Sequence, residues 1–275
     1  MALPSFLIKR VPKHKNMQSI RNLLQDAALH TVCESAKCPN IGECFARNTL
    51  TFMILGEVCT RSCRFCGVSK GSPLPPDPTE PKRVAEAVKK LRLNYVVITS
   101  VTRDDLKDGG ASLFAATINE CQISNIELRI EVLIPDFKGN MDLLQIVLDA
   151  NPFVLNHNIE TVPRLYSKVR PQADYKRSLN LIRIAKRRRP DIYLKSGFMV
   201  GLGEEKAEIF KVLEDLKEAG CDIVTIGQYL PPSREHLKPE RYVLPEEFEE
   251  FQNFEGLKVI AGPFIRSSYR AGEIV

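Results

Sequence analysis

The chain has 275 residues, with 39 Lys and Arg against 34 Asp and Glu, which gives a formal net charge of +5. Its apolar share of 44% and charged share of 27% are typical of globular proteins and exclude a disordered or collagen-like chain. The longest apolar runs fall far short of the ~18 residues that a membrane span requires. The small positive surplus does not indicate a nucleic-acid partner.

The N-terminal part, residues 1–49, is expected to form an extension with one helix at Met17–His30 and its own group of cysteines. The first residues have no basic residue ahead of their apolar part and contain Pro4, so they are unlike a secretory signal. We therefore expect a cytoplasmic protein that has no membrane attachment.

Six runs beyond residue 50 are rich in apolar and β-branched residues, are bounded by turn-forming residues, and predict strands. They are Leu50–Gly56, Tyr95–Val101, Glu127–Ile134, Phe153–Asn158, Tyr193–Val200 and Ile223–Tyr229. Helical spacing lies between them, for example at Val84, Val88 and Leu91 before the second strand. Alternating strands and helices predict a parallel sheet in an α/β fold, most simply a partial (β/α)6 TIM-like barrel over residues 50–244. Periodicity alone does not distinguish this barrel from an open doubly wound sheet.

The C-terminal tail, residues 245–275, is expected to contain a helix, a short strand-like run at Lys258–Ala261, and the sequence Arg266-Ser267-Ser268-Tyr269. We expect the extension and the tail to lie outside the six-unit core and to cover the barrel mouth. Taken alone, the two serines would be interpreted as a turn whose hydroxyls bond the local backbone.

Six of the eight cysteines lie within 34 residues. Clustered thiols in a reducing compartment are typical metal ligands rather than disulfide partners. Cys59, Cys63 and Cys66 follow the first predicted strand, where barrel folds place their chemistry. Structural zinc and ferredoxin-type clusters normally need a fourth ligand at a recognised spacing, and none is nearby. Three thiolates on a four-iron cube instead leave one iron open to a substrate.

This first triad resembles the signature of radical S-adenosylmethionine (SAM) enzymes, including the aromatic Phe65 just before its last cysteine. The resemblance implies a cluster that binds and cleaves SAM, with Phe65 beside the cofactor. A second triad, Cys33, Cys38 and Cys44, lies upstream. Its spacing alone is also compatible with zinc, but beside the first triad it suggests an auxiliary cluster whose fourth ligand comes from elsewhere.

Taken with the rest of the chain, the two triads resemble the lipoyl synthase family from about residue 30 to the end. The matching segments are Phe52–Gly56, Thr99–Asp105, Asp108–Ala111, His157–Pro163, Lys195–Gly197, Thr225–Leu230 and Arg266–Ala271. The resemblance implies that Ser268 is the fourth ligand of the auxiliary cluster. A serine oxygen binds iron less well than a thiolate and would be shed easily.

The resemblance also implies the reaction, in which two sulfur atoms are inserted at C6 and C8 of a protein-bound N6-octanoyl-lysine to give N6-lipoyl-lysine. The cofactors would be two [4Fe-4S] clusters and SAM, with the auxiliary cluster consumed as sulfur donor and no catalytic side chain. The partners would be octanoylated lipoyl domains of 2-oxoacid dehydrogenase complexes or the glycine-cleavage H protein, and an electron donor such as ferredoxin or flavodoxin.

The segment Asn156–Glu160 is also similar to biotin synthase, which implies that Asn158 and Glu160 contact the adenosine sugar. A helix cap at Glu160 is the alternative. We expect His157 to have a structural role with a fixed orientation rather than to be a ligand. We expect Cys121 and Cys221 to be buried and to take no part in the chemistry. Another radical sulfur inserter acting on a small molecule or an RNA base, and a non-enzymatic iron–sulfur carrier, are the competing functions.

Overall fold

A computed structural model of the chain describes residues 3–9 and 15–275, so residues 1–2 and 10–14 of the expected N-terminal extension lie outside the described part. One sheet of eight strands runs in the order β1-β2-β5-β6-β7-β8-β9-β10, and only the β1–β2 pair is antiparallel. Its strands are β1 (His30–Thr31), β2 (Thr51–Ile54), β5 (Tyr95–Ser100), β6 (Arg129–Leu133), β7 (Val154–Asn156), β8 (Tyr193–Val200), β9 (Ile223–Gln228) and β10 (Lys258–Gly262). A separate short pair joins β3 (Val58–Cys59) to β4 (Ser69–Lys70).

All six predicted strands are confirmed, because each predicted run contains one of the strands from β2 to β9 of this sheet. The sheet is larger than predicted at both edges. Its first edge carries β1, where His30 pairs with Met53, and its other edge carries β10, which is parallel to β9. The expectation that Lys258–Ala261 lies outside the core is therefore wrong, since this run extends the same sheet.

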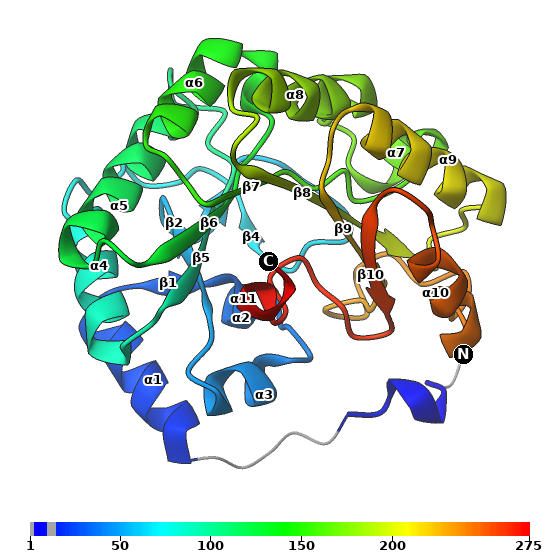
Figure 1. The fold of residues 1–275 in the computed structure, drawn as a ribbon. Helices are drawn as coiled ribbons and strands as arrows, with labels where there is room; N and C mark the ends of the chain where they lie inside the picture. The colour runs from blue at the N-terminus through cyan, green and yellow to red at the C-terminus, as the bar shows by residue number, and fades with distance from the viewer. Residues whose placement is uncertain (1–2, 10–14) are drawn as a thin grey trace.

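The sheet curves into a partial TIM-like barrel, as Figure 1 shows. The larger helices lie in an arc around its outer face, so the doubly wound alternative, with helices on both faces, is wrong. The barrel is not closed between the edge strands β1 and β10. The short helices of the extension and of the tail lie between these two edges (Figure 1).

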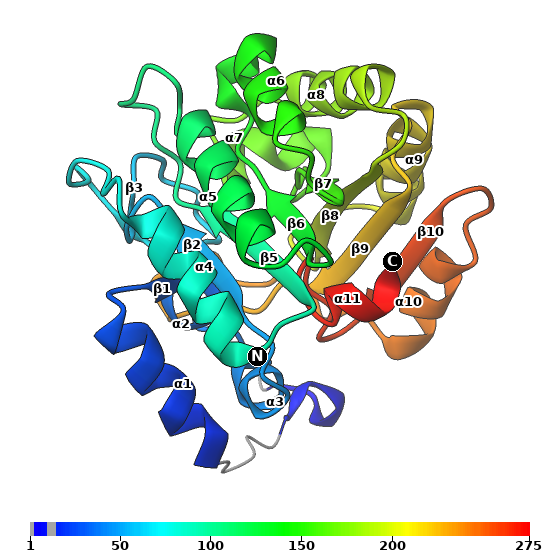
Figure 2. The same ribbon diagram turned by 60° about the vertical axis from the view of Figure 1, so that its left-hand side comes forward.

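The helices of the barrel alternate with its strands, while the two chain ends add further helices. They are α1 (Lys15–Asp26), α2 (Val32–Ser35), α3 (Ile41–Ala46), α4 (Glu80–Leu91), α5 (Ala111–Ser124), α6 (Met141–Asp149), α7 (Tyr166–Val169), α8 (Tyr175–Arg188), α9 (Lys206–Glu218), α10 (Pro245–Gln252) and α11 (Ala271–Ile274), with 3-10 turns at Ser5–Leu7, Phe137–Gly139 and Pro163–Leu165. The predicted helix Met17–His30 is confirmed as α1, but it ends at Asp26 because His30 is drawn into the sheet. Figure 2 shows α1 beside α4, where Arg83 donates a hydrogen bond of 2.8 Å to the Ala27 carbonyl.

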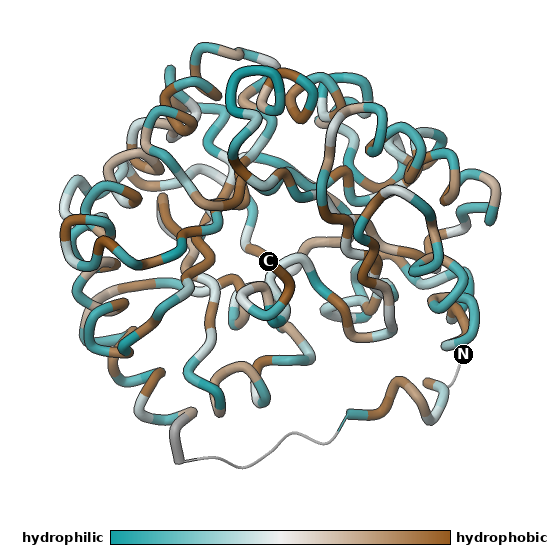
Figure 3. Tube along the Cα trace, in the orientation of Figure 1, coloured by the Kyte–Doolittle hydropathy of each residue, from teal (hydrophilic) through white to brown (hydrophobic). Residues whose placement is uncertain are grey.

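Helix α4 shows why these sequences fold as they do. Pro81 occupies its first turn, where a missing N–H costs nothing, and Val84 and Val88 are buried on one face. Burying each such side chain stabilises the fold by roughly 1.5–3 kcal/mol. The helix ends at Leu91, and Arg92 directly after it adopts the left-handed conformation typical of such ends. Figure 3 shows that apolar and polar residues are separated in the same way along the whole barrel. Apolar residues lie on the strands, and polar residues lie on the outer surfaces of the helices.

A buried ionic cluster lies on the strands below the cavity described next. We call it the barrel floor, and it comprises Tyr95, Glu131, Asn156 and Lys195. The Lys195 ammonium lies 2.9 Å from the Glu131 carboxylate, and both side chains are 0% exposed. Asn156 and the Tyr95 hydroxyl donate to the same carboxylate at 2.9 and 2.7 Å. Within the described ranges, no helix is both long and apolar enough to span a membrane.

Candidate functional site

The carboxyl ends of the strands surround a cavity of about 340 Å³. Its wall takes residues from β2, β5, β6, β8 and β9 and from the loop after β7, together with the extension around Cys38 and the tail around Ser268. Barrel enzymes build their active sites at this end of the strands. The cavity thus joins three parts of the chain that are far apart in sequence.

The first triad lies in the segment that follows β2, with Cys59 at the end of β3, and Cys59, Cys63 and Cys66 all line the cavity. The Cys59 sulfur accepts hydrogen bonds of 3.4 Å from the backbone N–H groups of Arg61 and Thr102. Burial raises the pKa of Cys63 and raises that of Cys66 to about 12. These thiols hold their protons until a positive centre binds them, so loading a metal cluster must release protons.

Arg61, between the first two cysteines of this triad, fastens the loop to the sheet. Its side chain is 5% exposed and forms ion pairs with Asp104 at 2.7 Å and Asp136 at 2.6 Å. Although burial opposes it, the hydrogen bond from Arg61 lowers the pKa of Asp136 to about 2. Asp105 pairs instead with Arg103 at 2.8 Å, so the adjacent carboxylates point to different partners. Asp104 and Asp105 therefore organise their loop rather than acting as an acid–base pair.

The second triad lies on α2, on α3 and in the turn between them. Cys33 and Cys38 line the large cavity, and all three of its cysteines line an adjoining cavity of about 120 Å³. Burial raises the pKa of Cys33 to about 12 and also raises that of Cys44. The two cavities share Cys33, Cys38 and Ser268. The second triad therefore borders the same space as the first.

The tail reaches this space because β9 carries a glycine, Gly227, at the point where the tail passes over it. A Cβ atom on Gly227 would lie 2.0 Å from the Ile265 carbonyl oxygen, a distance that no side chain tolerates. Ser267 accepts a hydrogen bond of 2.7 Å from Asn158, which is 109 residues away in sequence. The Ser268 hydroxyl borders both cavities and has no hydrogen-bond partner among the described residues. The interpretation of both hydroxyls as groups bonding the local backbone is therefore wrong.

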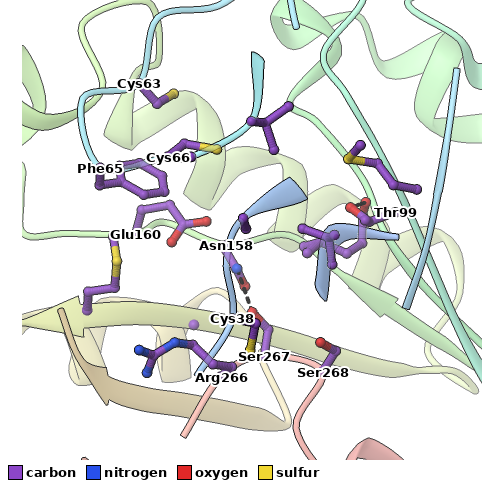
Figure 4. A pocket seen from close by; sticks show the side chains of 18 of the residues that line it. Cys38, Cys63, Phe65, Cys66, Thr99, Asn158, Glu160, Arg266, Ser267 and Ser268 are labelled. Carbon is purple, nitrogen blue, oxygen red and sulfur yellow. Dashed lines mark hydrogen bonds between the residues drawn. The ribbon is translucent and has the colours of Figure 1, made fainter. Parts of the chain in front are cut away.

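Asn158 and Glu160 lie between the two triads, as Figure 4 shows. Glu160 has φ of 65°, and its backbone is held on both sides by β8, through Gly197 and Met199. It does not cap a helix, so that alternative is wrong. Burial raises the pKa of the Glu160 carboxyl, while the nearby Arg170 opposes the rise. A non-glycine residue held at positive φ is a form of strain that proteins concentrate at functional sites.

The side chains in this region leave hydrogen-bonding capacity directed at the cavity. Within the described residues, neither the Asn158 side-chain oxygen nor the Tyr229 hydroxyl has a partner. Tyr229 is 1% exposed and follows β9. Such orphaned groups normally acquire a partner from a ligand or from water. Tyr229 and Arg170 were not predicted as site residues, since nothing in the sequence distinguishes them from core or loop residues.

Figure 4 also shows how the triads face each other. Cys63, Cys66 and Phe65 lie on one side of the view, whereas Cys38 and Ser268 lie on the other. Phe65 lines the cavity, as its expected place beside a cofactor requires. The two triads thus border one cavity, although Cys44 lines only the adjoining one.

Other sequence expectations also have outcomes. His157 donates or accepts at both ring nitrogens, with the Ile134 carbonyl at 2.9 Å and the Ser178 hydroxyl at 3.0 Å. Burial lowers the His157 pKa to about 4, so the ring is neutral and bonds to the carbonyl through an Nδ1–H. His157 therefore has a structural role with a fixed orientation, as expected. Cys121 and Cys221 are both buried, and both were expected to be spectators.

The donor set fits two iron–sulfur clusters. All eight cysteines are free thiols, and two groups of three border joined cavities with a serine hydroxyl beside the second group. Within the described residues, no three His, Cys, Asp or Glu side chains converge on one point as a single ion requires. A four-iron cube asks for one thiolate at each of several corners rather than for convergence on one atom.

Comparisons with known proteins agree with this site. The model of the radical SAM superfamily matches residues 53–216. The chain is 52% identical to the lipoyl synthase of Caldicellulosiruptor saccharolyticus over 98% of this chain and 96% of that protein. It is 54% identical to the lipoyl synthase of Caldanaerobacter subterraneus, over 94% of this chain and 92% of that protein.

Two solved structures share the fold at low identity. SuiB of Streptococcus suis, bound to S-adenosylmethionine, superposes with a TM-score of 0.60 at 11% identity, covering 81% of this chain and 53% of SuiB. HydG, a maturase of the [FeFe]-hydrogenase, gives a TM-score of 0.58 at 14% identity, covering 87% of this chain and 64% of HydG. These likenesses bear on the fold alone.

Proposed function

The chain belongs to the lipoyl synthase family of the radical SAM superfamily, and from that premise we propose which of its residues carry the reaction. The enzyme is a radical SAM sulfurtransferase. It inserts two sulfur atoms at C6 and C8 of a protein-bound N6-octanoyl-lysine to give N6-lipoyl-lysine. It uses SAM, one resident [4Fe-4S] cluster, and an auxiliary [4Fe-4S] cluster that is the sulfur-donating substrate.

We assign the resident cluster to Cys59, Cys63 and Cys66. When bound, this cluster supplies the electron that splits SAM and so makes it possible to remove hydrogen from carbons that no side-chain base can deprotonate. The chain's own part is to leave one cluster position open and to hold the loop still. Arg61 does the second task through Asp104 and Asp136, which come from the loops after β5 and β6.

We assign the auxiliary cluster to Cys33, Cys38, Cys44 and Ser268. The position of the Ser268 hydroxyl, bordering both cavities and bonding no other described residue, supports this assignment. An oxygen is a weaker match for iron than a thiolate, so this ligand is the easiest of the four to release. A cluster that must surrender its sulfur benefits from one such ligand.

We assign the SAM site to the space between the triads, with Asn158, Glu160 and Phe65 on its wall. A carboxylate can accept from two neighbouring hydroxyls of a ribose, and an unpartnered amide oxygen beside it can accept another donor. The backbone of Glu160 is held by hydrogen bonds to β8, which fixes the position from which its carboxyl extends.

The substrate is an octanoylated lipoyl domain. We propose that its source is a 2-oxoacid dehydrogenase complex or the glycine-cleavage H protein, and that ferredoxin or flavodoxin supplies the electrons. We also propose the cytoplasm as its compartment, because metal ligation by six thiols requires that they stay reduced.

One observation supports these assignments most strongly. Five of the six triad cysteines and Ser268 line one cavity, and the sixth, Cys44, lines a second cavity that shares three of those residues. Sulfur transfer to an octanoyl chain bound in one active site requires both clusters to border the same space. A simple electron carrier has no such requirement.

The test is anaerobic reconstitution followed by incubation with SAM, a reductant and an octanoyl-lysine peptide. We expect about eight irons per chain and dithiolated product, because two four-iron cubes are bound. The Cys33→Ala variant should still cleave SAM but transfer no sulfur, whereas the Cys121→Ala variant, which alters a buried spectator, should do both. About four irons in the unaltered chain, or cleavage without sulfur transfer, would contradict the assignments.

A further inference from the structure

The two ends of the chain meet at one carboxylate beside the auxiliary-cluster cysteines. Glu43, on α3 and directly before Cys44, accepts hydrogen bonds of 2.8 Å from the Tyr269 hydroxyl and 2.8 Å from Arg270. Its other oxygen lies 2.7 Å from the Lys9 ammonium. We call these four side chains, Lys9, Glu43, Tyr269 and Arg270, the latch.

The latch connects three segments that are far apart in the sequence. Glu43 and Tyr269 are 226 residues apart in sequence, and both flank cluster residues, Cys44 on one side and Ser268 on the other. Lys9 also lies 5.2 Å from the ring centroid of Tyr269, which adds a cation–π contact. A single carboxylate thus receives three donors at the point where α3 and the tail are adjacent.

The surrounding contacts give this connection a defined geometry. The Asn40 side chain, just before α3, donates a hydrogen bond of 2.7 Å to the Phe264 carbonyl at the start of the tail segment. Within that segment, the N–H of Tyr269 bonds to the Arg266 carbonyl at 3.0 Å, forming a turn. Ser268 lies inside this turn. Its hydroxyl therefore faces the second triad only while the turn stays docked on α3.

We propose that Glu43 is a positioning residue that holds Ser268 in place to ligate the auxiliary cluster, and that the latch is the contact that opens when Ser268 is released. The inference rests on the proposed ligand role of Ser268. Glu43 itself lines neither cavity. Charge-assisted hydrogen bonds are the stronger class in proteins, but this site is partly exposed, so the latch is strong enough to set a position and weak enough to open.

The alternative role for Glu43 is local, since an acidic side chain in the first turn stabilises a helix of its own accord. The chain offers a matched control for this role in Glu34. Glu34 also lies in the first turn of a helix, is also next to a triad cysteine, and also pairs with an arginine, at 3.0 Å. Its side-chain partners within the described residues, Arg21 and Thr31, both belong to the extension rather than to the tail. The side chains of Glu43 and Glu34 are 24% and 38% exposed.

The experiment compares Glu43→Ala with Glu34→Ala in the full-length chain. Amide hydrogen exchange of the tail peptide is measured before and after cluster loading, and iron loss to a chelator is measured afterwards. In Glu43→Ala we expect faster exchange at Tyr269 and Ala271 in both states, and loss of half of the iron at least about tenfold faster. In Glu34→Ala we expect the values of the unaltered chain.

Equal exchange and equal iron loss in the two variants would overturn the proposal. Should Glu43→Ala fail to fold, Tyr269→Phe removes only one of the hydrogen bonds and must shift both readouts in the same direction. The formation of 5′-deoxyadenosine from SAM should not change, because the first triad is anchored elsewhere. Faster loss of all the iron would therefore also contradict the latch.

The Ser268→Ala variant separates this inference from the function it rests on. If Ser268→Ala keeps the iron content and spectrum of the unaltered chain, Ser268 is no ligand and that assignment fails. If Ser268→Ala alters them while Glu43→Ala does not, the assignment stands and the latch fails.

Discussion

The first triad comes from one loop that is fastened to the sheet, whereas the second is assembled from the two ends of the chain. The first loop is held by a nearly buried arginine with two acidic partners in the loops after β5 and β6. The second site depends on α2, α3 and the tail, which meet across the gap between β1 and β10 (Figure 1). The difference matches the two roles, because a resident cofactor needs a permanent site and a consumed cluster needs one that can open and be refilled.

The largest expected effect separates the two triads by activity. Cys63→Ala should abolish SAM cleavage, because the cluster that donates the electron loses a ligand. Cys44→Ala should leave cleavage intact and abolish sulfur transfer. Both are measured as 5′-deoxyadenosine and lipoyl product in the same reaction. Loss of cleavage in both variants, or sulfur transfer by Cys44→Ala, would remove the distinction between the sites.

The next effect compares the ionic cluster under the cavity with an ion pair of the extension. Lys195→Met leaves the Glu131 carboxylate buried without its partner, which should lower the free energy of unfolding by about 3–5 kcal/mol. Arg21→Met breaks the exposed pair with Glu34 and should cost at most about 1 kcal/mol. Denaturant unfolding of the metal-free chains measures both. Similar losses would show that the barrel floor does not anchor the fold.

A pH effect is expected on the barrel side through His157. Burial lowers its pKa in the folded chain to about 4, so below its ordinary value of 6.5 the unfolded chain binds a proton that the folded chain does not. The His157 contribution to stability is therefore complete above pH 6.5 and decreases as the pH falls to about 4, by up to about 3 kcal/mol.

The measurement is the free energy of unfolding against pH for the metal-free chain and for His157→Gln. The difference between the two curves isolates this group from the raised carboxyl pKa values elsewhere. A difference that stays constant between pH 4 and 6.5 would show that folding does not lower the pKa of His157.

The smallest effect tests how the tail is docked. Gly227 and Gly262 are paired neighbours on β9 and β10, and both face Ile265. A Cβ on Gly227 would meet the Ile265 carbonyl at 2.0 Å, whereas one on Gly262 would meet a side-chain carbon at 3.3 Å. Gly227→Ala should therefore displace the tail, destabilise the chain by about 1–3 kcal/mol and lower the iron content toward four, while Gly262→Ala should be nearly neutral. The iron content of both variants after identical reconstitution decides the matter.

Sequence patterns predicted the barrel well because its strands are buried on both faces and separated by amphipathic helices. They missed β1 because two residues carry no periodicity, and they placed β10 outside the core because a short run does not reveal its partner. The end of α1 was also misplaced, since pairing of His30 with Met53 overrides its local helical pattern.

The cysteine ligands were predictable because their spacing is itself the signal. Arg61 lies inside the same motif, but only the structure shows that it pairs with two strand-end carboxylates. Glu43, Arg170 and Tyr229 have no sequence signal of this kind, because their roles depend on contacts with residues outside their own local segments. The positive φ of Glu160 is likewise a property of its pairing with β8 rather than of its residue type.

The central claim is that two iron–sulfur clusters border one cavity, one on the sheet and one between the chain ends. The most direct measurement is anomalous diffraction at the iron edge from crystals of the anaerobically reconstituted chain. We expect two separate groups of iron, one within bonding distance of Cys59, Cys63 and Cys66, the other reached by Cys33, Cys38, Cys44 and Ser268. A single group, a single tetrahedral ion in either triad, or a second group without an oxygen ligand from Ser268 would contradict this account.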